Sequence, residues 1–143
     1  MASIKRLSID NYDDIIRVWS ISGLPYKPKG RDRKDMIAKE MENPNGAFFG
    51  LFEDEKMIGV VIANFDGRRG WVNRLAIDPD YRGKGFAGLL IERCEDYLNK
   101  QGAIVMCALI EDINYPSISA FQKAGYNCEN TIKYFAKRPS DEA

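Results

Sequence analysis

Three strand-like segments follow one another between Ala47 and Ile77, and they constrain the fold more than any other feature of the sequence. The runs AFFGLFE, KMIGVVIANF and GWVNRLAID are rich in apolar, β-branched and aromatic residues, and the short polar stretches DEK and DGRRG separate them. Polar stretches of this kind between such runs are typical of hairpin turns. We therefore expect three consecutive antiparallel strands in the middle of the chain.

Helices and further strands are predicted on both sides of this meander. Before it, SIKRLSI alternates like an edge strand, Asp10 caps a first helix, and a short second helix covers about 32–42. After it come a helix over about 86–101, a buried strand AIVMCALI, a short helix PSISAFQKAG and a last strand NTIKYFAK. The order is β-α-α-β-β-β-α-β-α-β, with a further short strand possible near Tyr126. This order predicts a single α+β domain over residues 1–143.

The composition excludes several classes of partner and chemistry. The 143 residues carry 21 basic and 21 acidic side chains, so the overall charge gives no reason to expect nucleic acid or an anionic membrane as a partner. The apolar runs are too short to span a bilayer, and the amino terminus lacks a signal-peptide core, which favours a cytoplasmic protein. Histidine is absent and the three cysteines have no C-x-x-C spacing. We therefore expect no metal site, no disulfide framework and no Ser-His or Cys-His nucleophile.

Two nucleotide-site patterns overlap in YRGKGFAGLL, residues 81–90. The stretch GKGFAG spells G-x-G-x-x-G, which is typical of dinucleotide sites, whereas R-x-x-G-x-A, which begins at Arg82, indicates coenzyme A. A dinucleotide site needs its first glycine directly after a parallel strand, and here a turn with Pro79 intervenes. In either case the glycines expose N–H groups at a helix amino terminus, where an anion is favoured. Taken alone, these residues are equally compatible with an ordinary glycine turn whose charges are solvated.

Two segments together resemble a known family. The stretch VNRLAIDPDYRGKGFAGLLIERCEDYL, residues 72–98, resembles the acetyl-CoA-binding segment of the GNAT superfamily of N-acetyltransferases, with an apolar strand, Asp-Pro, an aromatic residue and an Arg-Gly-Lys-Gly loop. The stretch NYPSISAFQKAGY, residues 114–126, resembles the second signature of that superfamily. The resemblance implies a splayed, mostly antiparallel sheet of six to seven strands flanked by four helices. It also implies direct transfer of acetyl from acetyl-CoA to a primary amine, of a small molecule or a protein, in a ternary complex.

The resemblance further implies where acetyl-CoA would lie. Main-chain groups of the fourth strand would pair with the pantetheine arm, and one of their amides would polarise the thioester carbonyl. N–H groups of the glycine loop would hold the pyrophosphate, and residues of the second signature would lie along the pantetheine. These residues are Leu75, Ala76 and Ile77 in the strand, Arg82, Gly83, Lys84, Gly85, Phe86, Ala87 and Gly88 in the loop, and Asn114, Ser117 and Phe121 in the second signature.

A general base is needed because an alkyl ammonium must lose a proton before it can attack a thioester. Glu111, at the end of the fifth predicted strand, is the first candidate and Asp112 the second. For both residues the alternative is a solvated acid with no catalytic role. Asn73 occupies a position where some relatives have a glutamate, and it could at most orient a water molecule.

The acid that would protonate the departing thiolate is missing from its usual place. Phe121 stands where many members of the superfamily have a tyrosine proposed for this role. Because a thiol pKa of about 8.5 lies close to neutrality, water can reprotonate the thiolate, and the change does not exclude catalysis. Tyr115 and Tyr126 are nearby substitutes in the sequence.

The acceptor is poorly specified. The loop LPYKPKGRDRK, residues 24–34, borders the acceptor cleft in this fold, and its cations would attract an acidic peptide or a phosphorylated molecule, or would simply be solvated. Two other functions stay open. One is a non-catalytic acetyl-CoA-binding sensor or interaction domain, and the other is docking of nucleic acid or a protein through the basic loop. The sequence is compatible with a monomer or a homodimer.

Overall fold

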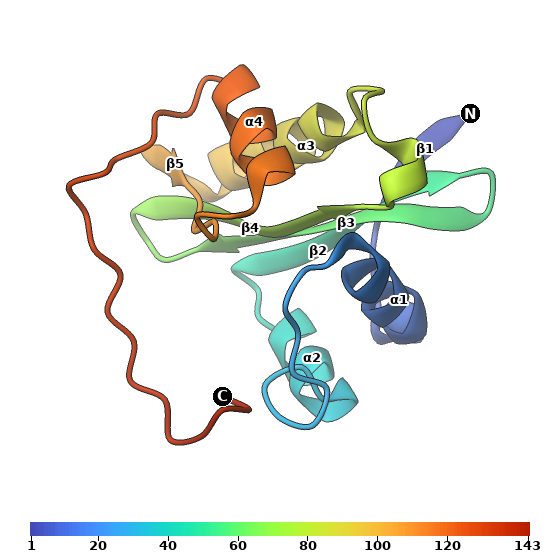
Figure 1. The fold of residues 1–143 in the computed structure, drawn as a ribbon, viewed down its shortest axis with the longest axis horizontal. Coiled ribbons are helices and arrows are strands. Elements are labelled where there is room, and N and C mark those ends of the chain that lie inside the picture. Colours follow the sequence, from blue (N-terminus) through green and yellow to red (C-terminus); the bar gives the residue numbers. More distant parts are fainter.

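The computed structural model describes residues 1–143 and contains one five-stranded mixed sheet (Figure 1). Its strands lie in the order β1-β2-β3-β4-β5, in which the first four pair antiparallel and β5 pairs parallel to β4. The bounds are Ala2–Arg6 for β1, Gly46–Glu53 for β2, Lys56–Phe65 for β3, Arg69–Ile77 for β4 and Val105–Cys107 for β5. The predicted central meander is confirmed as β2, β3 and β4.

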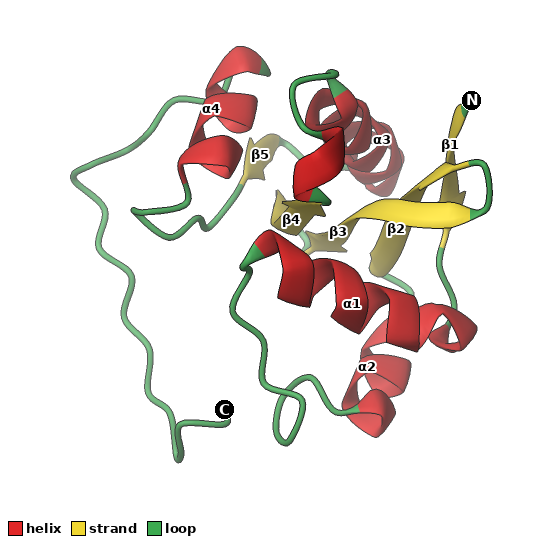
Figure 2. Cartoon of the chain, turned by 45° about the vertical axis from the view of Figure 1, so that its right-hand side comes forward, coloured by secondary structure: helices red, strands yellow, loops and turns green.

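Four helices cover the two faces of the sheet (Figure 2). They are α1 (Tyr12–Ser22) and α2 (Lys34–Met41) on one face, and α3 (Phe86–Gln101) and α4 (Tyr115–Lys123) on the other. Short 3-10 turns, η1 (Ile9–Asn11) and η2 (Pro79–Tyr81), precede α1 and the glycine loop. The helix count and the α+β class agree with the sequence prediction. None of these helices combines the length and the apolar composition that crossing a membrane requires.

A separate apolar core lies on each face, because β2 and β3 are buried along nearly their whole length. Successive side chains of a strand point to opposite faces, so Val61 packs toward α3 while Val60 and Ile62 pack toward α1. Ile58 also packs toward α3, because the pairing of β3 with β2 shifts register between Met57 and Gly59. Burying each such side chain stabilises the fold by about 1.5–3 kcal/mol. The sheet is therefore held from both sides, and its central strands are a rigid base for any site at their ends.

The fourth strand has an open edge and a bulge. β4 and β5 pair only between Arg69–Trp71 and Val105–Cys107, so the rest of β4 has no strand on that side. This is the expected splay. On the other side, Ile62 lies opposite Asn73 but Val60 lies opposite Ala76, which leaves one extra residue in β4. Arg74 and Leu75 therefore form a β-bulge, and the φ of Arg74, 57°, is in the left-handed region.

The predicted last strand, NTIKYFAK at residues 130–137, is absent, and no strand forms near Tyr126. The chain after α4 is irregular, and it moves away from the sheet before its end returns to the loop between α1 and α2 (Figure 1). There the Glu142 carbonyl accepts a hydrogen bond of 3.0 Å from the Arg31 amide. The alternation of residues 130–137 is strand-like, but a strand forms only where a partner satisfies its backbone, and the three-residue β5 offers little edge. The sheet thus has five strands rather than six to seven.

Candidate active site

The free edge of β4 is the first part of the site. Leu75 and Ile77 point into the core beneath α3, and Ala76 points into the core beneath α1, so all three side chains are buried. Ala76 and Ile77 pair with β3, Leu75 lies in the bulge, and no strand pairs with any of the three on the opposite side. The three residues that were predicted to bind the pantetheine arm through their backbone therefore lie at a strand edge that no other strand covers.

The glycine loop follows directly from that strand. The Asp78 side chain accepts a hydrogen bond of 3.0 Å from the Asp80 amide and so caps η2, which leads the chain into the loop. Gly83 and Gly85 have φ of 78° and 80°, a conformation that L side chains rarely adopt, and nothing lies within 4 Å of a Cβ built on either. The glycines are thus required by backbone conformation rather than by lack of space.

The loop ends at the start of α3, where the N-cap is Gly85 and no side chain caps the helix. The first amides of any α-helix have no acceptor within the helix, and here these include Phe86, Ala87 and Gly88. The first turn also contains no acidic residue. Unpaired amides and the positive end of the helix dipole make this position suited to a phosphate group.

The two cations of the loop are held by neighbours. Arg82 donates from Nη2 to the carbonyl oxygen of Ser22 at 3.2 Å, which ties the loop to the end of α1. The Nζ of Lys84 lies 5.4 Å from the centroid of the Tyr81 ring. Both cations belong to the loop that leads into α3.

The second signature lies at the start of α4, next to β4. Asn114 is the N-cap, and its side chain accepts a hydrogen bond of 3.3 Å from the Ser117 amide. The buried Ser117 hydroxyl is 3.5 Å from the Leu75 carbonyl oxygen, to which it donates. Phe121 is packed in the core, with its ring edge-on to that of Tyr126 at 5.0 Å. The structure therefore brings Asn114 and Ser117 to the open strand edge, whereas the ring of Phe121 faces the core.

The candidate acids lie beyond a strand that is shorter than predicted. β5 ends at Cys107, so Glu111 and Asp112 are in the loop between β5 and α4 and both are exposed. The side-chain oxygen of Asn73 accepts a hydrogen bond of 2.9 Å from the Leu109 amide. Asn73 therefore bridges the splay between β4 and this loop and so fixes where the loop begins.

Neither Tyr115 nor Tyr126 has surroundings that suit a general acid for the departing thiolate. Tyr126 donates from its hydroxyl to Oε2 of Glu95 at 2.8 Å, and burial, followed by that hydrogen bond, raises its pKa far above the ordinary value. Tyr115 is exposed at the first position of α4. The structure thus offers no direct replacement for the tyrosine missing at Phe121.

A buried ion pair was not found by sequence reasoning. Asp32, only 2% exposed, accepts from Nη1 of Arg74 at 2.7 Å and from the Lys27 amide at 2.7 Å. Arg74 also donates to the Pro25 carbonyl at 2.8 Å, and its guanidinium lies 3.9 Å from the centroid of the Trp19 ring. Burial lowers the pKa of Arg74, and the charge of Asp32 opposes that shift. The basic loop is therefore anchored to the β4 bulge through the single carboxylate among its cations.

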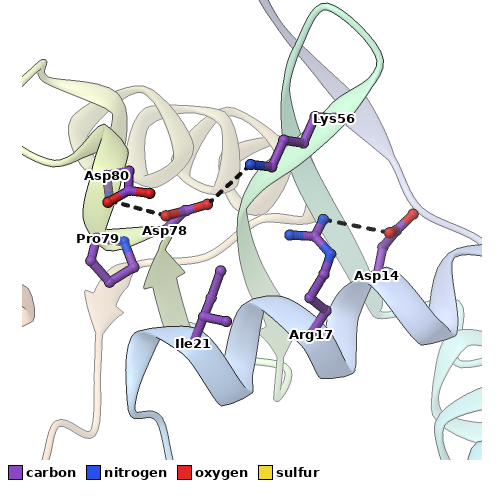
Figure 3. Close-up of a pocket in the computed structure, with 7 residues that line it drawn as sticks. All are labelled: Asp14, Arg17, Ile21, Lys56, Asp78, Pro79 and Asp80. Carbon is purple, nitrogen blue, oxygen red and sulfur yellow. Dashed lines mark hydrogen bonds and ion pairs between the residues drawn. The ribbon is translucent and has the colours of Figure 1, made fainter.

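A well-defined open cavity lies beside this site rather than in it. It has a volume of about 630 Å³, and Figure 3 shows its lining: Asp14, Arg17 and Ile21 of α1, Lys56 of β3, and Asp78, Pro79 and Asp80. The charges pair with one another, at 3.5 Å for Arg17 with Asp14 and 3.8 Å for Lys56 with Asp78. None of the predicted cofactor residues lines this cavity. We therefore place the candidate cofactor site at the open edge of β4 and the start of α3.

The open strand edge, the glycine loop and the capped α4 together define a class of acyl-group transferase, and a family model agrees. The model of the acetyltransferase (GNAT) family matches residues 12–126. The chain belongs to this family, and the resemblance found in the sequence is confirmed.

Individual relatives and structures agree with this assignment. An acetyltransferase of Yersinia pestis (strain Pestoides F) is 29% identical over 123 residues, which cover 86% of each chain. The crystal structure of PaiA N-acetyltransferase from Thermoplasma acidophilum in complex with coenzyme A is similar with a TM-score of 0.81 at 21% identity, and 92% of this chain and 93% of that chain are covered. AAC(6')-Iy in complex with a bisubstrate analogue has a TM-score of 0.79 at 15% identity, covering 96% and 99%. At these identities the structures establish the fold.

Proposed function

We propose that this protein is an acetyl-CoA-dependent N-acetyltransferase that moves the acetyl group directly to a primary amine of a small molecule or a protein. One observation carries the proposal. The open backbone edge of β4 runs into η2 and then into the uncapped amino terminus of α3, so a single strip offers first main-chain groups that no strand pairs with and then an anion site. Acetyl-CoA has the matching order of groups, an extended amide-bearing arm followed by a pyrophosphate.

The cofactor would lie along that strip. Main-chain groups of Leu75, Ala76 and Ile77 bind the pantetheine arm as an added strand would, and one of their amides donates to the thioester oxygen. The amides from Arg82 to Gly88 bind the pyrophosphate. Asn114 and Ser117 lie along the arm from the α4 side, and Phe121 supports them from the core.

The chemistry proposed is a single displacement in a ternary complex. The neutral amine nitrogen attacks the thioester carbon, and the carbonyl oxygen gains negative charge that the β4 amide stabilises. The intermediate then expels the thiolate of CoA, and its nitrogen releases a second proton to water. Glu111, or failing that Asp112, accepts the ammonium proton through a water molecule, which its exposed position permits. Water returns a proton to the thiolate, since a thiol pKa of about 8.5 needs no stronger acid.

Calorimetric titration with acetyl-CoA, CoA and NAD in parallel tests the proposal. We expect binding of acetyl-CoA and CoA but not of NAD, and loss of that binding when Gly83 and Gly85 are both replaced by alanine. Gly67→Ala is the matched control, because Gly67 also has a positive φ, of 97°, in open space but lies in the β3–β4 turn. Binding of NAD alone, or of none of the three, would overturn the assignment.

A second function has one specific observation in its favour. The position usually held by a tyrosine acid is the buried Phe121, and the tyrosine next to it is bonded to Glu95. A protein that binds acetyl-CoA without transferring acetyl would not need this acid. Release of CoA thiol with any member of an amine panel would exclude the sensor function. Tight binding with no release above the rate in buffer would support it.

A further inference from the structure

A second open cavity, of about 350 Å³, lies at the opposite edge of the sheet from the candidate active site. We call it the β1–α3 cavity, because its residues come from β1, β2 and the part of α3 from Arg93 onward. They are Arg6, Phe49, Arg93, Asp96, Tyr97 and Lys100. Three cations against one carboxylate give this small surface a formal charge of +2, in a chain whose overall charge is zero.

Aromatic rings hold both arginines of the cavity. The guanidinium of Arg93 lies 5.3 Å from the centroid of the Phe49 ring, and that of Arg6 lies 5.5 Å from the centroid of Tyr97. The two rings are themselves edge-on at 5.9 Å, and the Tyr97 hydroxyl donates to the Pro44 carbonyl. A guanidinium held against a ring keeps the N–H groups at its rim free to bind an oxyanion.

The cations of the cavity have no carboxylate partner. Every ion pair of the structure involves other residues, so Arg6, Arg93 and Lys100 have no acid within 4.0 Å, and Asp96 has no cation within that distance. Arg6 donates one hydrogen bond of 3.0 Å to the Gly46 carbonyl, whose charge is only partial. Like charges gathered in a hollow repel one another, and a bound anion would remove that repulsion.

We infer that the β1–α3 cavity binds a small molecule through a phosphate monoester group. A phosphate monoester carries about −1.5 to −2 charges at neutral pH, which matches the charge of the cavity. Its three terminal oxygens suit the planar donor groups of arginine, which bind phosphate with two parallel hydrogen bonds. The cavity is at the small end of the range for ligand sites, about 300–1,000 Å³.

The proposed ligand is separate from the cofactor of the proposed function. Arg93 and Lys100 follow the start of α3 at Phe86 by roughly 10 and 21 Å along the helix axis, at about 1.5 Å per residue. An extended polyanion would require a stripe of cations, whereas the cations here surround one hollow. A nucleic acid or an acidic protein segment is therefore the less suitable occupant.

An NMR titration of the ¹⁵N-labelled full chain, first saturated with CoA so that the cofactor site is filled, tests the inference. The probes are glucose 6-phosphate, inorganic phosphate and glucose. We expect glucose 6-phosphate to shift the amides around Arg93 to Lys100 and of Arg6 in a saturable way, inorganic phosphate to do so more weakly, and glucose to have no effect. If CoA itself fails to bind, the same titration of the free protein still tests this cavity.

Variants make the test specific. The double change Arg93→Gln with Lys100→Gln should weaken glucose 6-phosphate binding by about tenfold or more, because two charged donors are lost. Arg93→Lys keeps the charge but not the planar group and should give an intermediate loss. Arg68→Gln with Lys123→Gln removes two exposed cations elsewhere and should leave binding unchanged. The melting temperature of each variant shows whether it is folded.

Three results would overturn the inference. One is the absence of saturable shifts with either phosphate probe, and another is an equal loss of binding in the control pair, which would mean a general response to charge. The third is that an aspartate-rich peptide binds to the cavity while glucose 6-phosphate does not, which would make the cavity a docking surface for protein.

Discussion

Asp32 is a buried carboxylate, and the stability of the fold depends on the groups that compensate its charge. Arg74 and the Lys27 amide each lie 2.7 Å from one carboxylate oxygen, and the side chain of Asp32 is 3% exposed. Removing one partner of a buried pair leaves an uncompensated charge, which is more harmful than the absence of the whole pair. Arg74→Met should therefore lower the free energy of unfolding by about 3 kcal/mol, measured by urea denaturation.

The control for this prediction is Arg31. Its Nε lies 3.5 Å from Oδ2 of Asp32, the oxygen that also accepts from the Lys27 amide, but its side chain is 38% exposed. An exposed ion pair contributes about 0–1 kcal/mol, so Arg31→Met should change the free energy of unfolding by less than about 1 kcal/mol. Equal effects of the two substitutions would mean that the Asp32–Arg74 pair does not anchor the loop.

A second residue gives a prediction in acid. Asp66, in the β3–β4 turn, accepts from the indole Nε1 of Trp71 at 3.0 Å and from the amides of Arg68 and Arg69. The Trp71 hydrogen bond, followed by the two amides, lowers the pKa of Asp66 to about 2. An NMR titration of the carboxyl group should give a midpoint near that value.

The sign of the pH effect follows from this depressed pKa. The folded-state pKa of Asp66 lies below the ordinary value of 3.8, so its stabilising contribution is fully present above about pH 4 and is lost as the pH falls toward 2. Asp66→Asn should therefore reduce the fall in stability between pH 4 and pH 2 without affecting its pH dependence above 5. An ordinary midpoint near 3.8 for Asp66 would contradict the turn geometry.

At the scale of elements, the irregular chain after α4 is unusual because it exposes several large apolar side chains. Ile132, Tyr134 and Phe135 are 74%, 67% and 88% exposed, and no strand pairs with them. Unpaired amides exchange quickly, and exposed aromatic residues in an irregular segment are accessible to proteases. Chymotrypsin should cut first after Tyr134 or Phe135, as mass spectrometry of brief digests would reveal.

Deletion provides an independent measurement on the same element. Removing residues 130–143 discards no core residue, so the free energy of unfolding should change by less than about 1 kcal/mol. Slow hydrogen exchange at residues 131–137, or a larger loss of stability, would mean that this segment adds a strand to the sheet.

The sequence predicted those elements whose formation depends on local pattern. The meander of β2 to β4 and the four helices follow from alternation, helical spacing, turns and caps, and so does the position of the glycine loop. What failed depends on contacts between distant residues. The strand at 130–137 needed a partner that β5 does not provide, and Asp32 is paired with a residue 42 positions later in a bulge that no local pattern signals.

At the scale of the whole molecule, the candidate cofactor edge belongs to both cores. Within three consecutive residues of β4, Leu75 and Ile77 are part of the core beneath α3 and Ala76 of the core beneath α1. The neighbouring loop is attached to α1 through Arg82 and continues as α3. A ligand on this edge therefore contacts segments that only the intact fold keeps together, and unfolding of either layer would release it.

Acetyl-CoA should accordingly stabilise the entire chain in one transition. A ligand that binds only the folded state at roughly 100 times its Kd adds about 2.7 kcal/mol, which for a chain of this size raises the Tm by about 8 °C. We expect acetyl-CoA and CoA to produce such a rise in differential scanning calorimetry and NAD to produce none. Gly83→Ala with Gly85→Ala should abolish the rise, because the left-handed loop that presents the amides is then strained, whereas Gly67→Ala should keep it. A rise that persists in the double variant would locate the cofactor away from the glycine loop, and two separate transitions would mean that the edge of β4 does not couple the two layers.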